Sequence, residues 1–237
     1  MNLLLVADNE VSEDHLVTLS DRRAEHIRAV LNAKVGDSLR VGIRDGNVGR
    51  GEILSLNDTE VCLSLSCGDP PPAQAPIRLV LALPRPKVAR RVISAAVGFG
   101  VKEIVLLGAY RVEKSYWSSP LLSDAVMEET VTLALEQARD TLSPRIEKAQ
   151  RFKPFVEDVL PTFAKGTKRF LFHPEGPKGA PTACSGPVTV AIGPDGGWTQ
   201  YEAELLQNYG FEWVHFGPRI LRVETAVSAV LGRLCQT

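Results

Sequence analysis

The stretch IGPDGGW, residues 192–198, lies between two patterns of opposite kind and shows where the fold places its loops. The apolar run Val188–Ile192 before it has the length and composition of a buried strand. The residues after it, TQYE (199–202), form a capping box that begins a helix ending near Gly210. Three glycines and a proline within five residues leave a backbone that side chains do not crowd, so a ligand can approach it closely. The same composition also suits a plain tight turn, and the stretch alone leaves both interpretations open.

A second stretch, FGPRILRVETA (216–226), repeats this arrangement further along the chain. It follows the apolar run Trp213–Phe216 and opens a helical pattern over Val223–Leu234. Ile220 and Leu221 stand between two arginines, and apolar side chains beside cations suit a flat aromatic ligand with an anionic neighbour. Alternatively, both apolar residues belong to the core and the arginines are solvated. Two such loops together favour a ligand site more strongly than either does alone.

Strand and helix patterns alternate from residue 77 to the end of the chain. Continuous apolar strands alternating with helices predict an α/β fold with a parallel sheet covered on both faces. Because such sheets bind ligands in the loops after the carboxyl ends of their strands, the two glycine-rich loops are where we expect the chemistry. The apolar runs are Ile77–Leu83, Glu103–Leu107, Lys168–Phe172, Val188–Ile192 and Trp213–Phe216, and the helical patterns cover Val88–Val97, Met127–Ala138 and Val223–Leu234.

The first 68 residues have a different character. Three stretches, 39–43, 51–56 and 61–65, alternate apolar with polar or small residues and are separated by turn-rich segments, which predicts strands. One helix is expected after Asp21, with Ala24, Ile27, Val30 and Leu31 on one face. A small barrel with one helix is the economical arrangement. The proline-rich segment 70–76 predicts a stiff linker, so we expect domains over 1–69 and 77–237.

Composition excludes several classes of protein. The 237 residues are 44% hydrophobic and 23% charged with a net charge of −1, which is typical of a globular protein and not of a generic polycation. No apolar run is long enough to cross a membrane, and no basic leader indicates secretion. The four cysteines have no metal-ligand spacing, so we expect free thiols, no metal and a cytoplasmic protein. No dinucleotide fingerprint, phosphate loop, zinc-protease or nucleophile-elbow motif occurs.

The two stretches, read as IGPDGGWTQYEAELLQNYGF (192–211) and FGPRILRVETAVSAVLGRL (216–234), closely resemble the C-terminal motifs of the RsmE family. EHIRAVL (25–31) and VGD (35–37) resemble its N-terminal pattern, so the likeness spans essentially the whole chain. RsmE proteins are uridine-N3 methyltransferases of small-subunit (16S) ribosomal RNA, within the SPOUT class. The resemblance implies a PUA-like β-barrel domain that binds RNA, followed by a SPOUT methyltransferase domain with a C-terminal trefoil knot.

The resemblance also implies S-adenosyl-L-methionine as the cofactor, ribosomal RNA of the small subunit as the substrate, and a homodimer. It carries a set of cofactor-binding positions onto the ends of three strands. These are His173, Pro174, Ile192, Gly193, Gly196, Gly197, Phe216, Gly217, Ile220, Leu221 and Thr225. The segment PRPKVARR (84–91) departs from the family's usual pattern. A non-catalytic RNA-binding protein, or a methyltransferase acting on another RNA nucleotide, is the alternative.

Methylation at uridine N3 creates negative charge on the base as its proton leaves, and a guanidinium would stabilise that charge. Arg222 is the first candidate and Arg139 the second, while Glu224 either orients an arginine or caps its helix. Three stretches are locally basic: 22–50 holds seven basic and three acidic residues, 85–114 seven and two, and 145–169 seven and three. Solvated faces would explain any one of them, but three in a near-neutral chain suggest an RNA-binding surface. The RNA-binding candidates are Arg22, Arg23, His26, Arg28, Arg85, Lys87, Arg90, Arg91 and Lys114.

Overall fold

The computed structural model describes residues 2–182 and 184–235 and places them in two compact units. The N-terminal unit comprises Met1–Ala73 together with Thr132–Ser143, and the C-terminal unit comprises Gln74–Val131 and Pro144–Thr237. The division after Ala73 falls inside the proline-rich segment that predicts the linker. The sequence predicts two continuous domains, and it does not predict that residues 132–143 group with the N-terminal unit.

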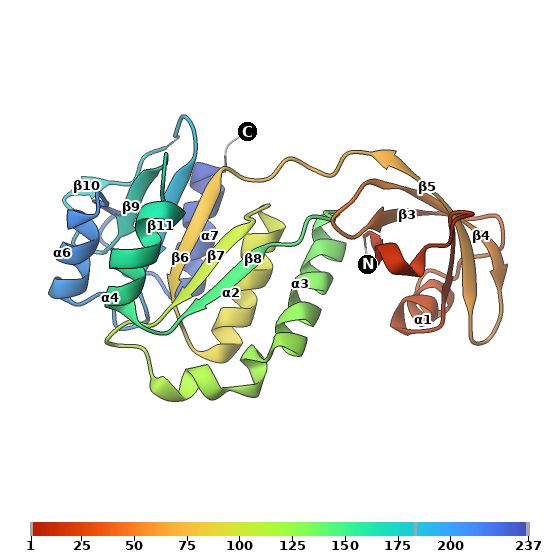
Figure 1. Cartoon of the computed structure of the whole chain (residues 1–237), viewed down its shortest axis with the longest axis horizontal. Coiled ribbons are helices and arrows are strands. Elements are labelled where there is room, and N and C mark those ends of the chain that lie inside the picture. The colour runs from red at the N-terminus through yellow and green to blue at the C-terminus, as the bar shows by residue number, and fades with distance from the viewer. Residues whose placement is uncertain (1, 183, 236–237) are drawn as a thin grey trace. The chain divides into compact units, whose positions relative to one another are not determined.

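The N-terminal unit is built on a five-stranded sheet with the order β1-β3-β4-β5-β2, and Figure 1 shows its strands β3, β4 and β5. The predicted strands are confirmed as β3 (Ser38–Ile43), β4 (Val48–Leu56) and β5 (Val61–Asp69), which pair antiparallel. Two short strands were not predicted: β1 (Leu4–Val6) runs parallel to β3, and β2 (Leu16–Leu19) pairs antiparallel with β5. A short 3₁₀ turn, η1 (Asp8–Glu10), connects them.

Helix α1 (Arg22–Ala29) begins where the sequence predicts, because the side chain of Asp21 accepts a hydrogen bond from the amide of Arg23 at 2.8 Å. Ala24 and Ile27 are fully buried against the sheet. The expectation that Val30 and Leu31 continue this buried face was wrong, because the helix ends at Ala29 and the two side chains are 62% and 43% exposed. Asn32, at φ 49°, then turns the chain away from the helical direction.

The C-terminal unit contains a seven-stranded sheet, entirely parallel, with the order β10-β12-β9-β11-β6-β7-β8. Five strands match the predicted apolar runs: β6 (Ile77–Ala82), β7 (Glu103–Leu107), β9 (Lys168–Phe172), β11 (Val188–Ile192) and β12 (Glu212–His215). The edge strands β8 (Arg145–Ala149) and β10 (Lys178–Gly179) were not predicted, since neither is apolar. The sheet confirms the predicted α/β fold, while the trefoil knot stays a prediction.

Helices lie on both faces of this sheet (Figure 1). The predicted helices are α2 (Pro86–Gly98), α3 (Asp124–Ala138) and α7 (Val223–Leu234), and α2 packs against α7. The remaining helical segments are α4 (Phe152–Pro154), a π turn over Phe155–Val159, α5 (Leu160–Phe163), α6 (Gln200–Asn208) and the 3₁₀ turns η2 (Lys114–Ser118) and η3 (Pro120–Leu122). Within the described ranges, no helix is both long and apolar enough to span a bilayer.

Burial explains why the sheet is a firm base for its loops. Leu79, Leu81, Val105 and Val190 have no exposed surface, and each buried side chain of this size contributes about 1.5–3 kcal/mol. Because all seven strands run in the same direction, their carboxyl ends meet at one edge of the sheet. The two glycine-rich stretches, after β11 and β12, therefore start from the same edge of a rigid frame, with the end of β9 between them.

Candidate active site

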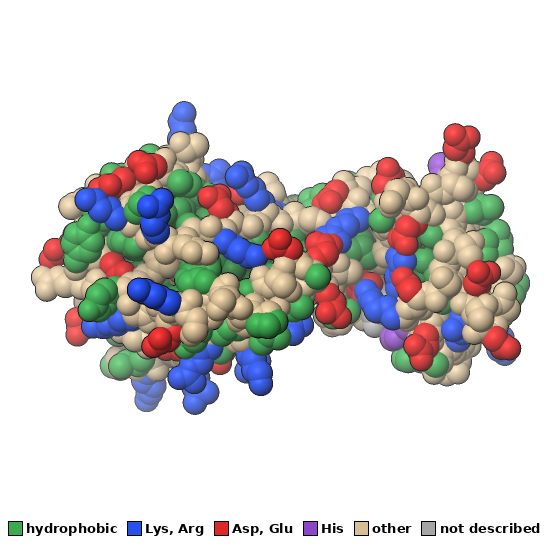
Figure 2. Space-filling view, turned by 60° about the horizontal axis from the view of Figure 1, so that its bottom comes forward, with side chains coloured by type: hydrophobic (Ala, Val, Ile, Leu, Met, Phe, Trp, Pro, Cys, Tyr) green, Lys and Arg blue, Asp and Glu red, His purple; other side chains and the backbone are tan. Residues whose placement is uncertain are grey.

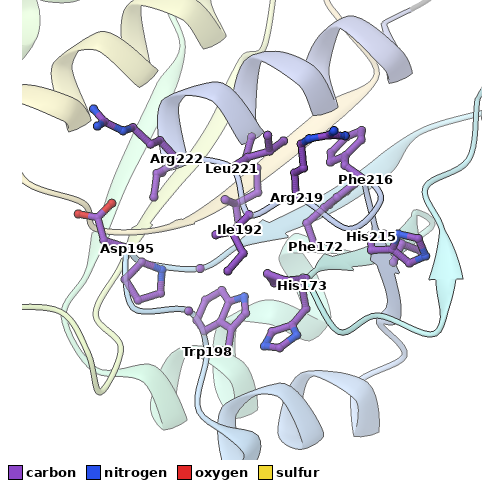
Figure 3. A pocket seen from close by; sticks show the side chains of 18 of the residues that line it. Phe172, His173, Ile192, Asp195, Trp198, His215, Phe216, Arg219, Leu221 and Arg222 are labelled. Carbon is purple, nitrogen blue, oxygen red and sulfur yellow. The ribbon is translucent and has the colours of Figure 1, made fainter.

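A cavity of about 350 Å³ opens at this edge of the C-terminal unit (Figure 3). Its walls are the segments that follow three adjacent strands, β12, β9 and β11. The lining residues are Phe172, His173, Pro174, Ile192, Gly193, Pro194, Asp195, Gly197, Trp198, Val214, His215, Phe216, Gly217, Arg219, Ile220, Leu221, Arg222, Val223 and Ala226. The two glycine-rich stretches thus form opposite parts of one site.

The loop after β11 depends on its glycines. The amide of Gly197 donates to the carbonyl of Pro194 at 2.7 Å, which closes a tight turn, and Gly197 has φ 73°. At Gly193 a Cβ would stand 3.1 Å from the indole ring of Trp198, so a larger residue would displace that ring or project into the cavity. The predicted capping box is confirmed: Thr199 and Glu202 bond each other reciprocally and begin α6 directly after the turn.

The loop after β12 is shaped by a histidine that sequence reasoning did not select. The amide of Gly217, at φ 101°, donates to Nδ1 of His215 at 2.7 Å. Phe216 stacks on Phe172 with ring centroids 5.0 Å apart, which joins this loop to the end of β9. The chain then reaches Arg222, the residue preceding α7, in an extended conformation. Ile220 lies on the cavity wall and yet is 82% exposed, so the interpretation of Ile220 as a core residue was wrong.

The end of β9 contributes the third wall. The amide of Glu175 donates to Nδ1 of His173 at 3.1 Å, and the imidazole ring lies 5.6 Å from the ring of Trp213. Because Nδ1 of both His173 and His215 accepts a backbone hydrogen bond, the neutral form of each ring carries its proton on Nε2. Both imidazoles can therefore offer Nε2–H as a donor to a ligand.

Most of the predicted cofactor-binding residues come together here. His173, Pro174, Ile192, Gly193, Gly197, Phe216, Gly217, Ile220 and Leu221 line the cavity, as does the catalytic candidate Arg222. Gly196 and Thr225 do not line the cavity, but each is next in sequence to a residue that does: Gly196 to Gly197, and Thr225 to Ala226. Glu224 lies in the first turn of α7 outside the lining, where a negative charge offsets the helix dipole, which favours the capping interpretation.

The second catalytic candidate is placed elsewhere. Arg139 follows α3 at φ 60° and belongs to the segment 132–143 of the N-terminal unit. It does not line the cavity, so the cavity itself supports only Arg222. Four further lining residues were not among the predicted site residues: Asp195, Trp198 and Arg219 stand within the two quoted stretches, and Phe172 directly precedes His173. Arg111, which contacts the loop after β11 without lining the cavity, was not predicted either.

Several of the RNA-binding candidates already form side-chain contacts within their own unit. Arg22 forms a bidentate ion pair with the carboxylate of Glu136, at 2.9 and 3.0 Å, and the side chain of Glu136 is only 3% exposed. Arg90 donates to the hydroxyl of Thr130 at 3.0 Å. His26 lines a small hollow beside Arg22, and Nη1 of Arg28 is buried without a hydrogen-bond partner among the described residues.

Arg23 makes the most polar contacts of these residues. Its guanidinium contacts the carboxylates of Glu10 and Asp21 and donates to the carbonyl of Leu5 at 2.9 Å, and its side chain is 11% exposed. The hydrogen bond with Arg23 lowers the pKa of Glu10. Burial works to raise the pKa of Asp21, but hydrogen bonds from Arg23 outweigh it and the pKa is lowered. Arg23 is thus less available to RNA than its position in a basic stretch suggests.

We expect R23A to destabilise the N-terminal unit by about 1–2 kcal/mol at pH 7, because two partly solvated carboxylates lose their partner. Carboxyl groups with a lowered folded-state pKa stabilise the fold above their ordinary values, here 4.5 and 3.8, and that stabilisation is lost as the pH falls. Urea unfolding should therefore show a deficit at pH 7 that shrinks below about pH 4.5. The exposed Arg40 provides the control as R40A. A loss in the free energy of unfolding that is equal at pH 7 and below about pH 4.5 would contradict this explanation.

The remaining RNA-binding candidates lie in the C-terminal unit. Arg85, Lys87, Arg91 and Lys114 are exposed, and Arg85 approaches Asp195 of the cavity loop at only 3.9 Å. Figure 2 shows several Lys and Arg side chains projecting from one edge of this unit, whereas basic and acidic side chains are interspersed on the N-terminal unit.

No group of three or more potential metal ligands occurs within the described residues.

Comparison with known proteins agrees with this geometry. Residues 71–235 match the model of the RNA methyltransferase domain, and residues 19–66 match the RNA methyltransferase PUA domain. Ribosomal RNA small subunit methyltransferase E of Treponema pallidum is 29% identical over 235 residues, covering 97% of this chain and 88% of the relative. The protein of the same name from Synechocystis is 28% identical, covering 98% and 76%.

A solved structure shows the same fold. Ribosomal RNA small subunit methyltransferase E from Neisseria gonorrhoeae, bound to S-adenosyl methionine, superposes with a TM-score of 0.77 at 20% identity, covering 98% of this chain and 95% of that one. The methyltransferase domain model alone spans well over half of the chain, and the cavity lies inside the matched region. The protein therefore belongs to the RNA methyltransferase family and carries that family's PUA domain.

Proposed function

We propose that this enzyme transfers the methyl group of S-adenosylmethionine to N3 of a uridine in small-subunit ribosomal RNA. The observation that carries the proposal is the cavity formed by the motif loops after β9, β11 and β12. Relatives that cover nearly the whole chain are named as small-subunit ribosomal RNA methyltransferases, which supports the class of substrate. The uridine N3 position rests on the resemblance of the two motifs to the RsmE family.

The residues present fit S-adenosylmethionine. A cavity of about 350 Å³ lies within the range of small-molecule sites. Apolar side chains of Phe172, Ile192 and Leu221 suit a flat base, while Asp195 and Arg219 suit a ligand with charges of both signs. The indole N–H of Trp198 is buried without a protein partner in the described part of the chain, so a ligand acceptor can satisfy it. Gly193 and Gly197 leave the backbone open on the same wall.

Bound S-adenosylmethionine supplies an electrophilic methyl group on a positively charged sulfur. The protein's own task is to hold the uridine with its N3 edge facing that group and to stabilise the anion formed when the imide proton passes to solvent water. Negative charge then spreads over N3, O2 and O4, and we assign its stabilisation to Arg222, whose side chain is exposed at the cavity. Holding both substrates together supplies much of the remaining rate.

A labelled methyl-transfer assay tests the proposed function. Purified protein, small ribosomal subunits and S-adenosylmethionine labelled in the methyl group should yield labelled 3-methyluridine after digestion of the RNA to nucleosides. Calorimetry with S-adenosylmethionine separates this function from that of a non-catalytic RNA-binding protein. Absence of both heat and methyl transfer would overturn the proposal, and label in another nucleoside would transfer it to a different target.

We further propose that RNA is bound through the exposed basic residues of the C-terminal unit, Arg85, Lys87, Arg91 and Lys114. Phosphate contacts release counterions, so affinity should fall steeply with salt. We expect K87A and R91A each to reduce the slope of log affinity against log salt by about 0.7–0.9. K178A, which removes an exposed lysine outside the three basic stretches, is the control. Binding that does not respond to salt would contradict the assignment.

We also propose a homodimer in the cytoplasm. Ile220 supports the dimer, because an apolar side chain that is 82% exposed on the cavity wall would be covered by a second copy. The four cysteines are free thiols, which agrees with a reducing compartment. Light scattering of the purified protein tests the dimer, and a mass corresponding to a single chain would contradict it.

A further inference from the structure

The segment that follows β7 reaches the cavity loop from another part of the sheet. In the sheet order, β6 lies between β7 and β11, so this segment must pass the end of β6 to reach the loop after β11. Two contacts join them: Nη1 of Arg111 donates to the carbonyl of Gly196, and the amide of Tyr110 donates to Oε1 of Glu202 at 2.7 Å. The first contact is made to the turn at Pro194–Gly197 itself, and the second to the first turn of α6, which follows it.

The receiving carboxylate is a firm anchor. Glu202 is 2% exposed, and besides the amide of Tyr110 it accepts from the amide and the hydroxyl of Thr199, both at 2.9 Å. A buried carboxylate with three donors has little freedom to move, because losing any of them leaves charge unsatisfied. The backbone at Tyr110 is therefore held in place relative to the start of α6.

The segment itself is also anchored at both ends. A Cβ at Gly108 would stand 2.1 Å from the carbonyl oxygen of Gln150, so the chain passes very close to its neighbour there. The amide of Gly108 donates to the carbonyl of Ala149 at 2.7 Å, which fixes one end, and the side chain of Val112 is buried at the other end, with 8% of it exposed. Residues 108–112, which we call the strap, thus form a rigid element beside a loop rich in glycine.

The turn and the arginine match each other. The hydrogen bond of the turn uses the Pro194 carbonyl and the Gly197 amide, which leaves the Gly196 carbonyl for another donor. Gly196 also leaves space for the arginine, since a Cβ there would stand 3.0 Å from Cδ of Arg111. Arg111 is exposed and does not line the cavity. It therefore acts on the site through its contact with the loop, and it does not contribute to the core.

We propose that Arg111 is a positioning residue for the cofactor site. Through Arg111, the strap holds the Pro194–Gly197 turn in the conformation that forms the cavity wall. The proposal rests on the proposed function for the identity of the ligand. A glycine-rich turn samples many conformations, and a ligand that needs one of them loses affinity in proportion to the population of the others. Arg111 reduces that loss before the ligand arrives.

Hydrogen exchange of the ligand-free protein tests the strap without any cofactor. In R111A, amides in a peptide covering 193–203 should exchange roughly fivefold faster, since one exposed hydrogen bond of this kind shifts an equilibrium by about that factor. R145A removes another exposed arginine, from β8 of the same unit, and should leave this peptide unchanged. R111K retains a donor and a charge and should restore part of the protection. Unchanged exchange in R111A would overturn the proposal.

Calorimetry with S-adenosylhomocysteine completes the test. R111A should bind it about five- to tenfold more weakly than the wild type, with an unaltered unfolding midpoint, while R145A binds normally. Faster exchange combined with wild-type affinity in R111A would overturn the link to the cofactor. Failure of the wild type itself to bind S-adenosylhomocysteine would count against the proposed function and not against the strap, whose exchange result stands alone. G196A, which crowds Arg111 from the other side, should reproduce both effects if R111A folds poorly.

Discussion

G193V is expected to reduce the affinity for S-adenosylmethionine by more than about 100-fold, the largest effect on cofactor binding that the structure predicts. A Cβ at Gly193 would stand 3.1 Å from Cδ1 and Nε1 of Trp198 and 3.2 Å from its amide nitrogen. The two γ-methyl groups of valine have no room on the side of the ring, so they must displace the indole or project into the cavity. Either outcome destroys the wall that receives the ligand.

Calorimetry on folded protein measures this effect, with G179V as the matched control. Gly179 lies in β10 of the same unit, and a Cβ there meets nothing within 4 Å, so the same substitution should leave affinity unchanged. Circular dichroism shows whether G193V retains its fold. A folded G193V that binds S-adenosylmethionine within about threefold of the wild type would place the cofactor outside this cavity.

R222A is expected to lower methyl transfer by about 10²–10³-fold while leaving the affinity for S-adenosylhomocysteine close to that of the wild type. Arg222 precedes α7 in an extended conformation and lines the cavity, and the structure gives it no carboxylate partner within residues 2–182 and 184–235. Its charge is therefore available to an anion formed in the reaction. Removing a group that acts only on the developing charge lowers turnover and leaves cofactor binding intact.

Single-turnover kinetics with R222A, R222K and R139A test this assignment. R222K should recover part of the rate, since it keeps the charge but not the planar fork of donors. R139A is the matched control, because Arg139 is the other catalytic candidate and lies in the segment grouped with the N-terminal unit. Near-normal turnover in R222A together with a large loss in R139A would reverse the assignment of the catalytic arginine.

The cavity was largely predictable from the sequence because its chemistry is local. Each wall is one continuous motif after one strand, and glycine, proline and capping residues indicate a loop by their spacing alone. Even His215 and Trp198, which were not selected, stand directly beside residues that were. Ile220 was harder to assign, since only the structure shows that an apolar residue of this loop is exposed.

The parts that were missed depend on pairing or on distant contacts. The sequence RIEKA of β8 has no apolar run, because an edge strand is partly exposed, and its pairing with β7 alone makes it a strand. Strands β1 and β2 are only three and four residues long and owe their conformation to β3 and β5. Arg111 and Gly196 are 85 residues apart, and Tyr110 and Glu202 are 92 apart, so no local pattern indicates the strap.

Mass mapping of ribosomal RNA from cells that lack this protein tests the central claim most directly. We expect one 3-methyluridine to disappear from the small-subunit RNA and to return when the wild-type protein is supplied, but not when R222A is supplied. An unchanged 3-methyluridine content in small-subunit RNA from the deficient cells would contradict it.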